Sequence, residues 1–390
     1  MIKDGQCSDQ YMARPSLVAV VCVLAMVAGT IWVFIVAILA PTFSSMLGIT
    51  AAQLGVAYAS YYSAATASTK ALGKLVDRIP LQVSICIFAG LSWTQFALLA
   101  VSTNWRGLAI SGIFGGLSLG MSNPVTNSLI VWTVHPRHLR WVVGIKQAGV
   151  PAAGVLAGSV VPLLVGSVGW RATVILALLL PIGPAVWVLI TDPRRSSMLD
   201  SALAEDARND MRIGTYAFLL GVVAAGLNGY LALYIVDELG HSLERGGAIL
   251  AAFALAGAVG RIGWAAGGGN RNVLHLLMAL AGVGALGLLG LSLAVAEWSV
   301  WLAAITCGLT VMSWQSLGML GVMQSHRGST GQASGQVLRA FYGGFVIGSV
   351  MVGVLVDLLG FRVAWAALVL VAVTAGLSVG WTARVPLRAT

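Results

Sequence analysis

Two basic side chains, Lys146 and Arg339, stand well inside long apolar segments of this sequence, where a charge is costly. An ionisable group at the centre of a bilayer costs at least about 2.5 to 3.5 kcal/mol, so it normally faces a cavity or a partner. Gln147 adjoins Lys146, and Gln336 lies on the same helical face as Arg339. The pattern predicts two positively charged, polar patches that face a common cavity.

The acidic residues favour an anionic ligand. Every carboxylate falls in a loop, in a tail or at the end of an apolar segment. A carrier of cations usually needs a buried Asp or Glu to hold its cargo. We therefore expect a small anion bound by charge-assisted hydrogen bonds, with Arg339 as its principal partner and Lys146 as the second. The alternative for Lys146 is an ammonium group that reaches the membrane interface from a buried stem.

Polar and aromatic side chains in other apolar segments complete the candidate pocket. Asn123 and Asn127 are one helical turn apart, so both can face one cavity. The alternative for each candidate is an anchor at the membrane interface or a hydrogen bond to a neighbouring helix. Arg261 is assigned to the loop that follows its segment and not to the pocket. The other candidates are Thr30, Trp32, Tyr58, Tyr61, Tyr62, Asn228, Tyr230, Tyr234, Trp264, Trp314, Gln315 and Tyr342.

Composition identifies lipid as the solvent of this chain. Hydrophobic residues make up 58% of it and charged residues 9%, and the mean hydropathy is +0.91. A soluble globule could not cover itself with so few polar groups. The apolar runs are continuous and do not alternate, which predicts helices and not barrel strands. The four cysteines have no metal-ligand or redox spacing, so no metal or cofactor is expected.

Gly, Pro and charged residues divide the apolar runs into twelve predicted spans, each about 20 residues or longer. The fold class is therefore an all-α membrane protein. The predicted spans are residues 17–40, 51–72, 80–101, 107–134, 140–166, 171–191, 213–237, 246–267, 272–295, 298–322, 331–356 and 363–383.

Basic residues predict the orientation. With the N-terminus in the cytoplasm, most Lys and Arg of the loops fall on the cytoplasmic side, and Arg106, Arg171, Arg245 and Arg362 on the other. The positive-inside rule then places both termini in the cytoplasm, with the N-terminal tail retained. The net charge of +9 is an orientation signal, because no single basic patch suited to nucleic acid is present.

A long polar stretch, residues 192–212, divides the chain into two halves of six spans, residues 1–191 and 213–390. Internal repetition supports this division. Gly-Ser-Val precedes Gly-Trp-Arg near Gly169, and Gly-Ser-Val precedes Gly-Phe-Arg near Gly360. We expect a cytoplasmic linker between two parallel repeats.

A charged turn, residues 73–78 with the sequence Gly-Lys-Leu-Val-Asp-Arg, separates the second predicted span from the third. A degenerate copy, Gly-Gly-Gly-Asn-Arg, occupies residues 267–271. In a chain of twelve predicted spans, this turn resembles the signature loop of the major facilitator superfamily. The resemblance implies two pseudo-symmetric halves of six helices. The run Gly-Ile-Lys-Gln-Ala-Gly-Val-Pro, residues 144–151, is similar to bacterial permeases of that superfamily for cyanate-type and small organic anions.

The resemblance also implies how the halves move. Helices 2, 5, 8 and 11 would form the sliding contact between them, in keeping with the small residues of span two at every fourth position; ordinary packing within one half is the alternative. Asp77 would latch a cytoplasmic gate by capping the start of span eleven near Ser329 and Thr330; a solvated turn is the alternative. The implied gating residues are Gly73, Asp77, Arg78, Asn270 and Arg271.

These observations predict a secondary active transporter of a small organic, anionic solute that works by alternating access. We expect a monomer, multi-pass in a bacterial inner membrane, whose partners are the lipid bilayer, the solute and a co-transported proton or an exchanged anion. A proton-coupled multidrug or metabolite efflux pump and a non-transporting sensor of the same fold are the alternatives. An enzyme is not expected, because the sequence has no His-x-x-x-His pair, Gly-x-Ser-x-Gly motif or Walker loop.

Overall fold

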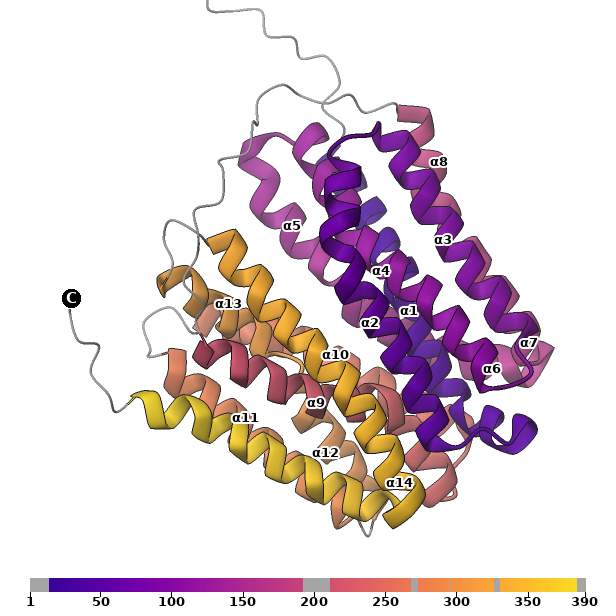
Figure 1. Ribbon diagram of the computed structural model, residues 1–390, viewed down its shortest axis with the longest axis vertical. Helices are drawn as coiled ribbons and strands as arrows, with labels where there is room; N and C mark the ends of the chain where they lie inside the picture. Colours follow the sequence, from indigo (N-terminus) through magenta and orange to yellow (C-terminus); the bar gives the residue numbers. More distant parts are fainter. Residues whose placement is uncertain (1–13, 192–210, 268–272, 295, 326–329, 384–390) are drawn as a thin grey trace, which may run out of the picture.

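The computed structural model describes residues 14–191, 211–267, 273–294, 296–325 and 330–383, which form helices joined by short turns (Figure 1). The first part contains α1 (Pro15–Leu47), α2 (Ala51–Val76), α3 (Leu81–Val101), α4 (Trp105–Thr133), η1 (Pro136–His138), α5 (Leu139–Gln147), α6 (Gly149–Val168), α7 (Trp170–Leu176), η2 (Ala177–Leu179) and α8 (Ile182–Thr191). The second part contains α9 (Met211–Leu233), η3 (Tyr234–Glu238), α10 (Leu243–Gly267), α11 (Val273–Ser292), α12 (Glu297–Thr310), α13 (Trp314–Ser325) and α14 (Thr330–Ala383). The predicted all-helical class is confirmed.

Within the described residues, ten helical stretches are long and apolar enough to cross a membrane. The expected number of twelve differs from this for two reasons. α2 is long enough but carries many hydroxyl side chains, and α14 contains two lengths of helix that meet at Gly360 with φ of 79°. The number twelve stays a prediction that fits this arrangement.

Three predicted spans are broken where the sequence analysis expected continuous helices. Span five divides into α5 and α6 at Ala148, because Pro151 cannot donate to the carbonyl of Gln147 and its ring crowds that carbonyl. Span six is interrupted before α8, next to Pro181. Span ten divides into α12 and α13, with residues 311–313 in a turn.

The helices pack as two groups, α1–α8 and α9–α14, drawn in indigo to magenta and in salmon to yellow in Figure 1. The groups meet mainly where α2 packs on α14, α6 on α10, and α1 on α9. Spans two, five, eight and eleven thus lie at the contact, as the resemblance implies. Most of the predicted linker, residues 192–210, lies outside the described residues.

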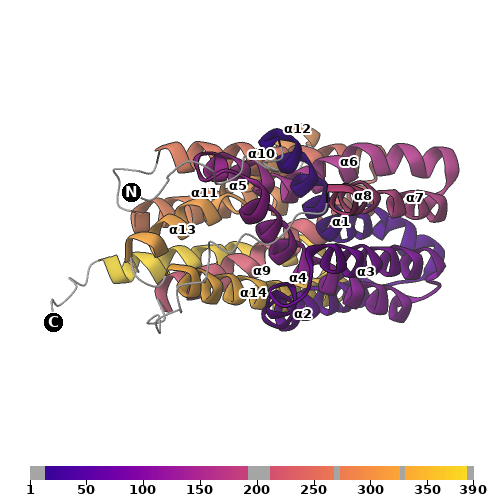
Figure 2. The ribbon, with the colours of Figure 1, turned by 90° about the horizontal axis from the view of Figure 1, so that it is seen from above.

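The two ends of the bundle differ. The closed end contains the turns at Gly48, Gly169, Gly240 and Gly360, and the split end contains the first residue of α1 and the last residues of α8 and α13. The groups lie together where α2 packs on α14 and α6 on α10, whereas α8 and α13 lie far apart in Figures 1 and 2. The groups therefore form a V that opens at the split end.

Candidate functional site

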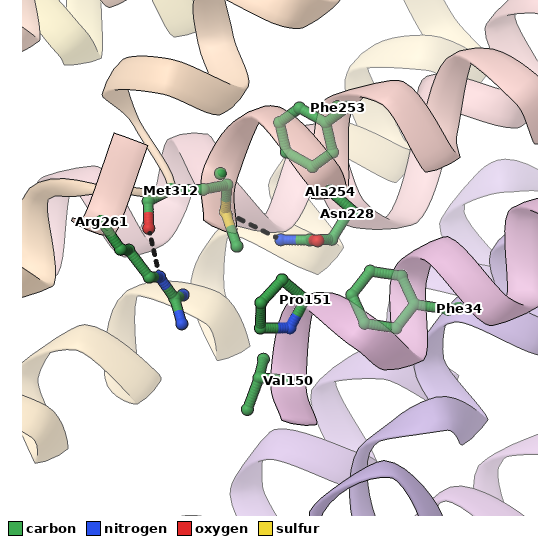
Figure 3. A pocket seen from close by; sticks show the side chains of 9 residues that line it. Phe34, Val150, Pro151, Asn228, Phe253, Ala254, Arg261 and Met312 are labelled. Atoms are coloured by element: carbon green, nitrogen blue, oxygen red, sulfur yellow. Dashed lines mark hydrogen bonds between the residues drawn. The ribbon is translucent and has the colours of Figure 1, made fainter. Parts of the chain in front are cut away.

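A small cavity with an accessible volume of about 10 Å³, room for about one water molecule, lies where the two groups meet (Figure 3). Phe34 of α1 and Val150 and Pro151 of α6 line it from one group. Asn228 of α9, Phe253, Ala254, Gly257 and Arg261 of α10, and Met312 line it from the other. Arg261 is the charged residue of this lining and Asn228 the polar one, and the surface that the cavity exposes is apolar.

Arg261 is held by the break between α12 and α13. Its Nε–H donates to the Met312 carbonyl at 2.9 Å. That carbonyl is available because the N–H of Ser316 bonds to Ser313 instead of to Met312. In Figure 3 the other guanidinium nitrogens point downward from the bond to Met312, to the left of Pro151 and Val150. Since a guanidinium has five N–H donors and Nε uses one, Arg261 can offer a planar pair of donors to a ligand in the cavity.

Two further side chains tie α10 to the same break. Trp264 Nε1 donates to the Leu309 carbonyl at 2.9 Å, and Ser313 Oγ donates to the Gly257 carbonyl at 3.2 Å. These bonds satisfy carbonyls and a hydroxyl that the interrupted helix and its neighbour present to each other. Interrupted helices in a membrane are tolerated where they are buried in protein or line a cavity, and in transporters they build the ligand site.

Asn228 is the second polar residue of the cavity. Its Nδ2 donates to the Ala224 carbonyl at 2.8 Å and contacts Met312 Sδ at 3.5 Å. Its Oδ1 is buried and has no hydrogen-bond partner. Asn228 and Arg261 therefore both contact Met312: Asn228 contacts its sulfur, and Arg261 donates to its carbonyl.

Lys146 lies in the last turn of α5 and is not among the residues that line this cavity. It is fully buried, and its Nζ donates to Asn127 Oδ1 at 2.5 Å. Asn127 is itself exposed, so the pair links the protein interior to the surface of the V. The structure brings these two residues together, and binding of a ligand by them stays a prediction.

The two predicted cations differ from expectation in burial. Arg339, expected to be the deeper, is exposed, whereas Lys146 is buried. Gln147 is exposed, and Gln336 has a buried Oε1 without a partner. The reason is the V shape, which leaves the split-end part of α14 uncovered.

The assignment of Arg261 to a loop was wrong, because the residue lies within α10 and lines the cavity. The degenerate copy of the charged turn, residues 267–271, follows Arg261 closely, and this led to the assignment to a loop. The informative signal was an arginine well inside an apolar run, flanked by glycines that let a neighbouring backbone approach.

Most aromatic candidates have partners in the protein. Tyr58 donates to the Gly229 carbonyl at 3.1 Å and Tyr234 to the Leu291 carbonyl at 2.8 Å. Tyr62 packs on Phe345 with ring centroids 4.2 Å apart, and Trp314 packs on Phe341 at 5.1 Å. These contacts make packing their observed role. Asn123 and Gln315 are half-buried, and the structure shows no ligand contact that would test them.

The predicted gating residues lie at the split end. Gly73 is in the last turn of α2, and Asp77 and Arg78 are exposed just beyond it. Asn270, Arg271 and Ser329 lie outside the described residues, so the expected contact between Asp77 and the start of α14 stays a prediction.

A latch of the expected kind occurs at the closed end, where the sequence analysis did not place one. Asp357 of α14 accepts from the N–H of Ala51 and of Ala52, both at 2.9 Å, through its two carboxylate oxygens. Thr50 caps the next free N–H, that of Gln53. The Tyr230 hydroxyl lies 3.0 and 2.7 Å from the carbonyl oxygens of Ala51 and Ser349 and donates its one hydrogen to either of them. The start of α2 is thereby bound to the second group.

Comparison with known proteins agrees with this architecture. Residues 20–342 match the family model of the Major Facilitator Superfamily, and no curated protein matches the chain. A solved structure of a bacterial homologue of the human lysosomal transporter Spinster, inward-facing and occupied, is similar with a TM-score of 0.78 and 15% identity over 96% of this chain and 98% of that one.

Two other solved structures are also similar. A mutant of the nucleoside transporter NupG gives a TM-score of 0.79 at 13% identity over 94% of this chain and 99% of that one. The human organic anion transporter MFSD10 (TETRAN) gives 0.66 at 13% identity over 94% and 100%. Likeness at such low identity concerns the fold alone.

Proposed function

The chain belongs to the Major Facilitator Superfamily, and on that premise we propose that it moves a small anionic organic solute across a membrane by alternating access. The observation that carries the anionic character is Arg261, a cation among the residues that line the cavity between the two groups of helices. Of the carboxylates in the described residues, each lies at a helix end or in a turn, away from the cavity lining. A half-buried cation inside the bundle, without a carboxylate beside it, calls for an anion from outside.

The V shape supports an inward-facing state. The split end carries Lys70, Lys74, Arg78 and Arg137, which the positive-inside rule places in the cytoplasm. The closed end, with Arg106 and Arg171, would then face the outside. Both termini and the linker would be cytoplasmic, as in a plasma-membrane transporter of a bacterium.

Two six-helix repeats, residues 1–191 and 213–390, are part of this proposal. The repeated motifs around Gly169 and Gly360 support it, because both glycines have positive φ, 81° and 79°, and each begins the last membrane-crossing stretch of its group. A lone monomer is sufficient for the mechanism, since the cavity lies within one chain.

Substitution of Arg261 tests the proposal. Arg261→Gln should reduce uptake of the anion into proteoliposomes at least about tenfold, because the buried charge that neutralises it is lost. Arg261→Lys keeps the charge but loses the planar fork, so partial activity is expected. Arg171→Gln, an exposed arginine stacked on Trp170 at the closed end, is the matched control and should transport normally.

The predicted roles of Arg339 and Lys146 are measured in the same assay. Lys146→Gln and Arg339→Gln should each weaken binding if the anion passes them on its way to Arg261. Normal uptake by Arg261→Gln, or a cationic substrate, would contradict the proposed function.

The orientation has its own test. In a background without native cysteines, His241→Cys at the closed end should react with a membrane-impermeant maleimide added to intact cells. A cysteine at position 200, in the predicted linker, should be protected. The reverse pattern would overturn the orientation and with it the inward-facing assignment.

A further inference from the structure

We propose that the cavity selects anions that also carry a hydrogen-bond donor, a hydroxyl or an amino group close to the acid, and that Asn228 is the residue that reads this donor. The inference rests on the proposed function, because it assumes that the acid binds Arg261. It adds a second requirement that a charge alone would not impose.

The orientation of the Asn228 amide is fixed by its surroundings. Nδ2 donates to the Ala224 carbonyl at 2.8 Å. If the amide were rotated by half a turn, Oδ1 would face that carbonyl and two acceptors would repel each other. The amide nitrogen therefore stays on the Ala224 side, and Oδ1 is the atom left to interact with a ligand.

Asn228 Oδ1 is a hydrogen-bond acceptor that no donor of the described residues satisfies. It is buried and unpartnered, in a residue that lines the cavity and is 3% exposed. A buried acceptor without a donor is costly, so natural proteins rarely keep one without a reason. Its cavity neighbours Phe34, Phe253 and Pro151 have no side-chain donor to offer. A ligand hydroxyl or N–H would supply the missing bond.

Met312 positions both polar residues of the cavity. Arg261 Nε binds the Met312 carbonyl, and Asn228 Nδ2 contacts the Met312 sulfur. Both side chains are thus positioned by a single residue, and the accessible space beside them is about 10 Å³, room for one water-sized group. A hydroxyl or amino group of an acid bound at Arg261 has that size.

A second buried hydroxyl supports the same chemistry. Thr30 lies one turn before Phe34 on the same face of α1, and its Oγ1 is also buried without a partner. A ligand that bonds to Thr30 would therefore also need a hydrogen-bonding group on the split-end side of the cavity. A solute would enter an inward-facing transporter from that side.

Matched pairs of acids test the inference by binding titration on the purified full-length protein. The probes are glycolate and acetate, lactate and propionate, 2-hydroxybutyrate and butyrate, and malate and succinate, with 1,2-propanediol as the uncharged probe. We expect at least one hydroxy acid to bind about tenfold or more tightly than its unsubstituted partner, because a site built for a hydroxyl rejects the analogue that lacks it. The diol should not bind, since it has no charge for Arg261.

Asn228→Leu should bring the two members of a pair to similar affinity, chiefly by weakening the hydroxy acid. Leu has the same branching at Cγ as Asn but is larger and has no acceptor, and Asn228→Ser, which is smaller and keeps an acceptor, should retain part of the preference. The comparison of acids on the unmodified protein does not depend on either variant.

The outcomes separate the two proposals. Anions that bind without preference for the hydroxyl, and lose affinity in Arg261→Gln, would overturn the role of Asn228 and leave the proposed function intact. Failure of every acid to bind would contradict the proposed function as well.

Discussion

Both the closed end and the split end of the bundle have glycines on the helices of the moving contact, but these glycines are tightly packed at the closed end and have open space around them at the split end. At the closed end, a Cβ atom on Gly55 would overlap the Ser349 carbonyl, and one on Gly353 would overlap the Ala51 carbonyl. At the split end, Gly144 and Gly335 have open space around them. Both pairs lie on helices that the resemblance assigns to the moving contact.

This difference indicates that the contact between the groups is made by backbones at one end at a time. Glycine at the closed end lets α2 and α14 touch, and Asp357 and Tyr230 then bind the touching ends. Glycine at the split end is unused in this conformation. In an alternating-access mechanism it would be used in the other one, when the split end closes.

The largest effect is expected from Gly55→Val, which forces α2 away from α14. Overpacking of a close contact costs about 1–3 kcal/mol, so the inward-facing state should lose most of its population and transport should fall sharply. Distances between spin labels across the closed end would report the change. Gly144→Val, the same substitution in open space, is the control and should leave that distance unchanged. Equal shifts in both variants would remove the distinction between the two ends.

Asp357→Asn should have an intermediate effect. Loss of the carboxylate from the first turn of α2 costs about 1 kcal/mol, so the ratio of inward-facing to outward-facing protein should fall about fivefold. Crosslinking of cysteine pairs across each end measures that ratio.

Asp77→Asn is the matched comparison and should shift the ratio the other way, toward the inward-facing state, because Asp77 is expected to hold the split end closed. Shifts of the same sign in the two variants would contradict the paired latches.

Among the substitutions at the closed end, Tyr230→Phe should have the smallest effect. It removes a hydroxyl that donates to one of two carbonyls while the ring and its packing on Tyr58 remain. The loss of a neutral hydrogen bond is worth about 0.5–1.5 kcal/mol, so a modest shift of the same sign as that of Asp357→Asn is expected. The same crosslinking assay applies, and an unchanged ratio would show that Asp357 alone binds this end.

Much of the fold could be predicted because lipid imposes length and hydropathy on every crossing helix. The ends of α3 and α11, for example, agree with the predicted spans to within a few residues. The breaks at Ala148 and at residues 311–313 were missed, since hydropathy averages over a short turn. Pro151 was a local signal for the first break. The second is stabilised by Arg261, Trp264 and Ser313, partners distant in sequence.

The candidate site was predicted less well for the same reason. Lys146 and Asn127 were both named, but their mutual hydrogen bond depends on how α5 packs against α4. Arg339 was predicted to face the cavity, whereas Arg261 is the arginine that lines it. The position of a residue along a helix can be read from the sequence, but its coverage by another helix cannot. The latch made by Asp357 was not predicted. Its partner, the start of α2, lies in the other group and far away in the sequence.

The polarity of α2 has a consequence for how the protein is made. Its hydroxyls are satisfied locally, as when Thr66 and Thr69 donate to carbonyls one turn earlier, and its length is packed between α4 and α14. Such a helix gains little from lipid by itself, so α2 should enter the bilayer poorly during synthesis until α4 has emerged from the ribosome. A nascent chain truncated after α2 should leave this segment outside the membrane in an insertion assay, and extension beyond α4 should bring it in.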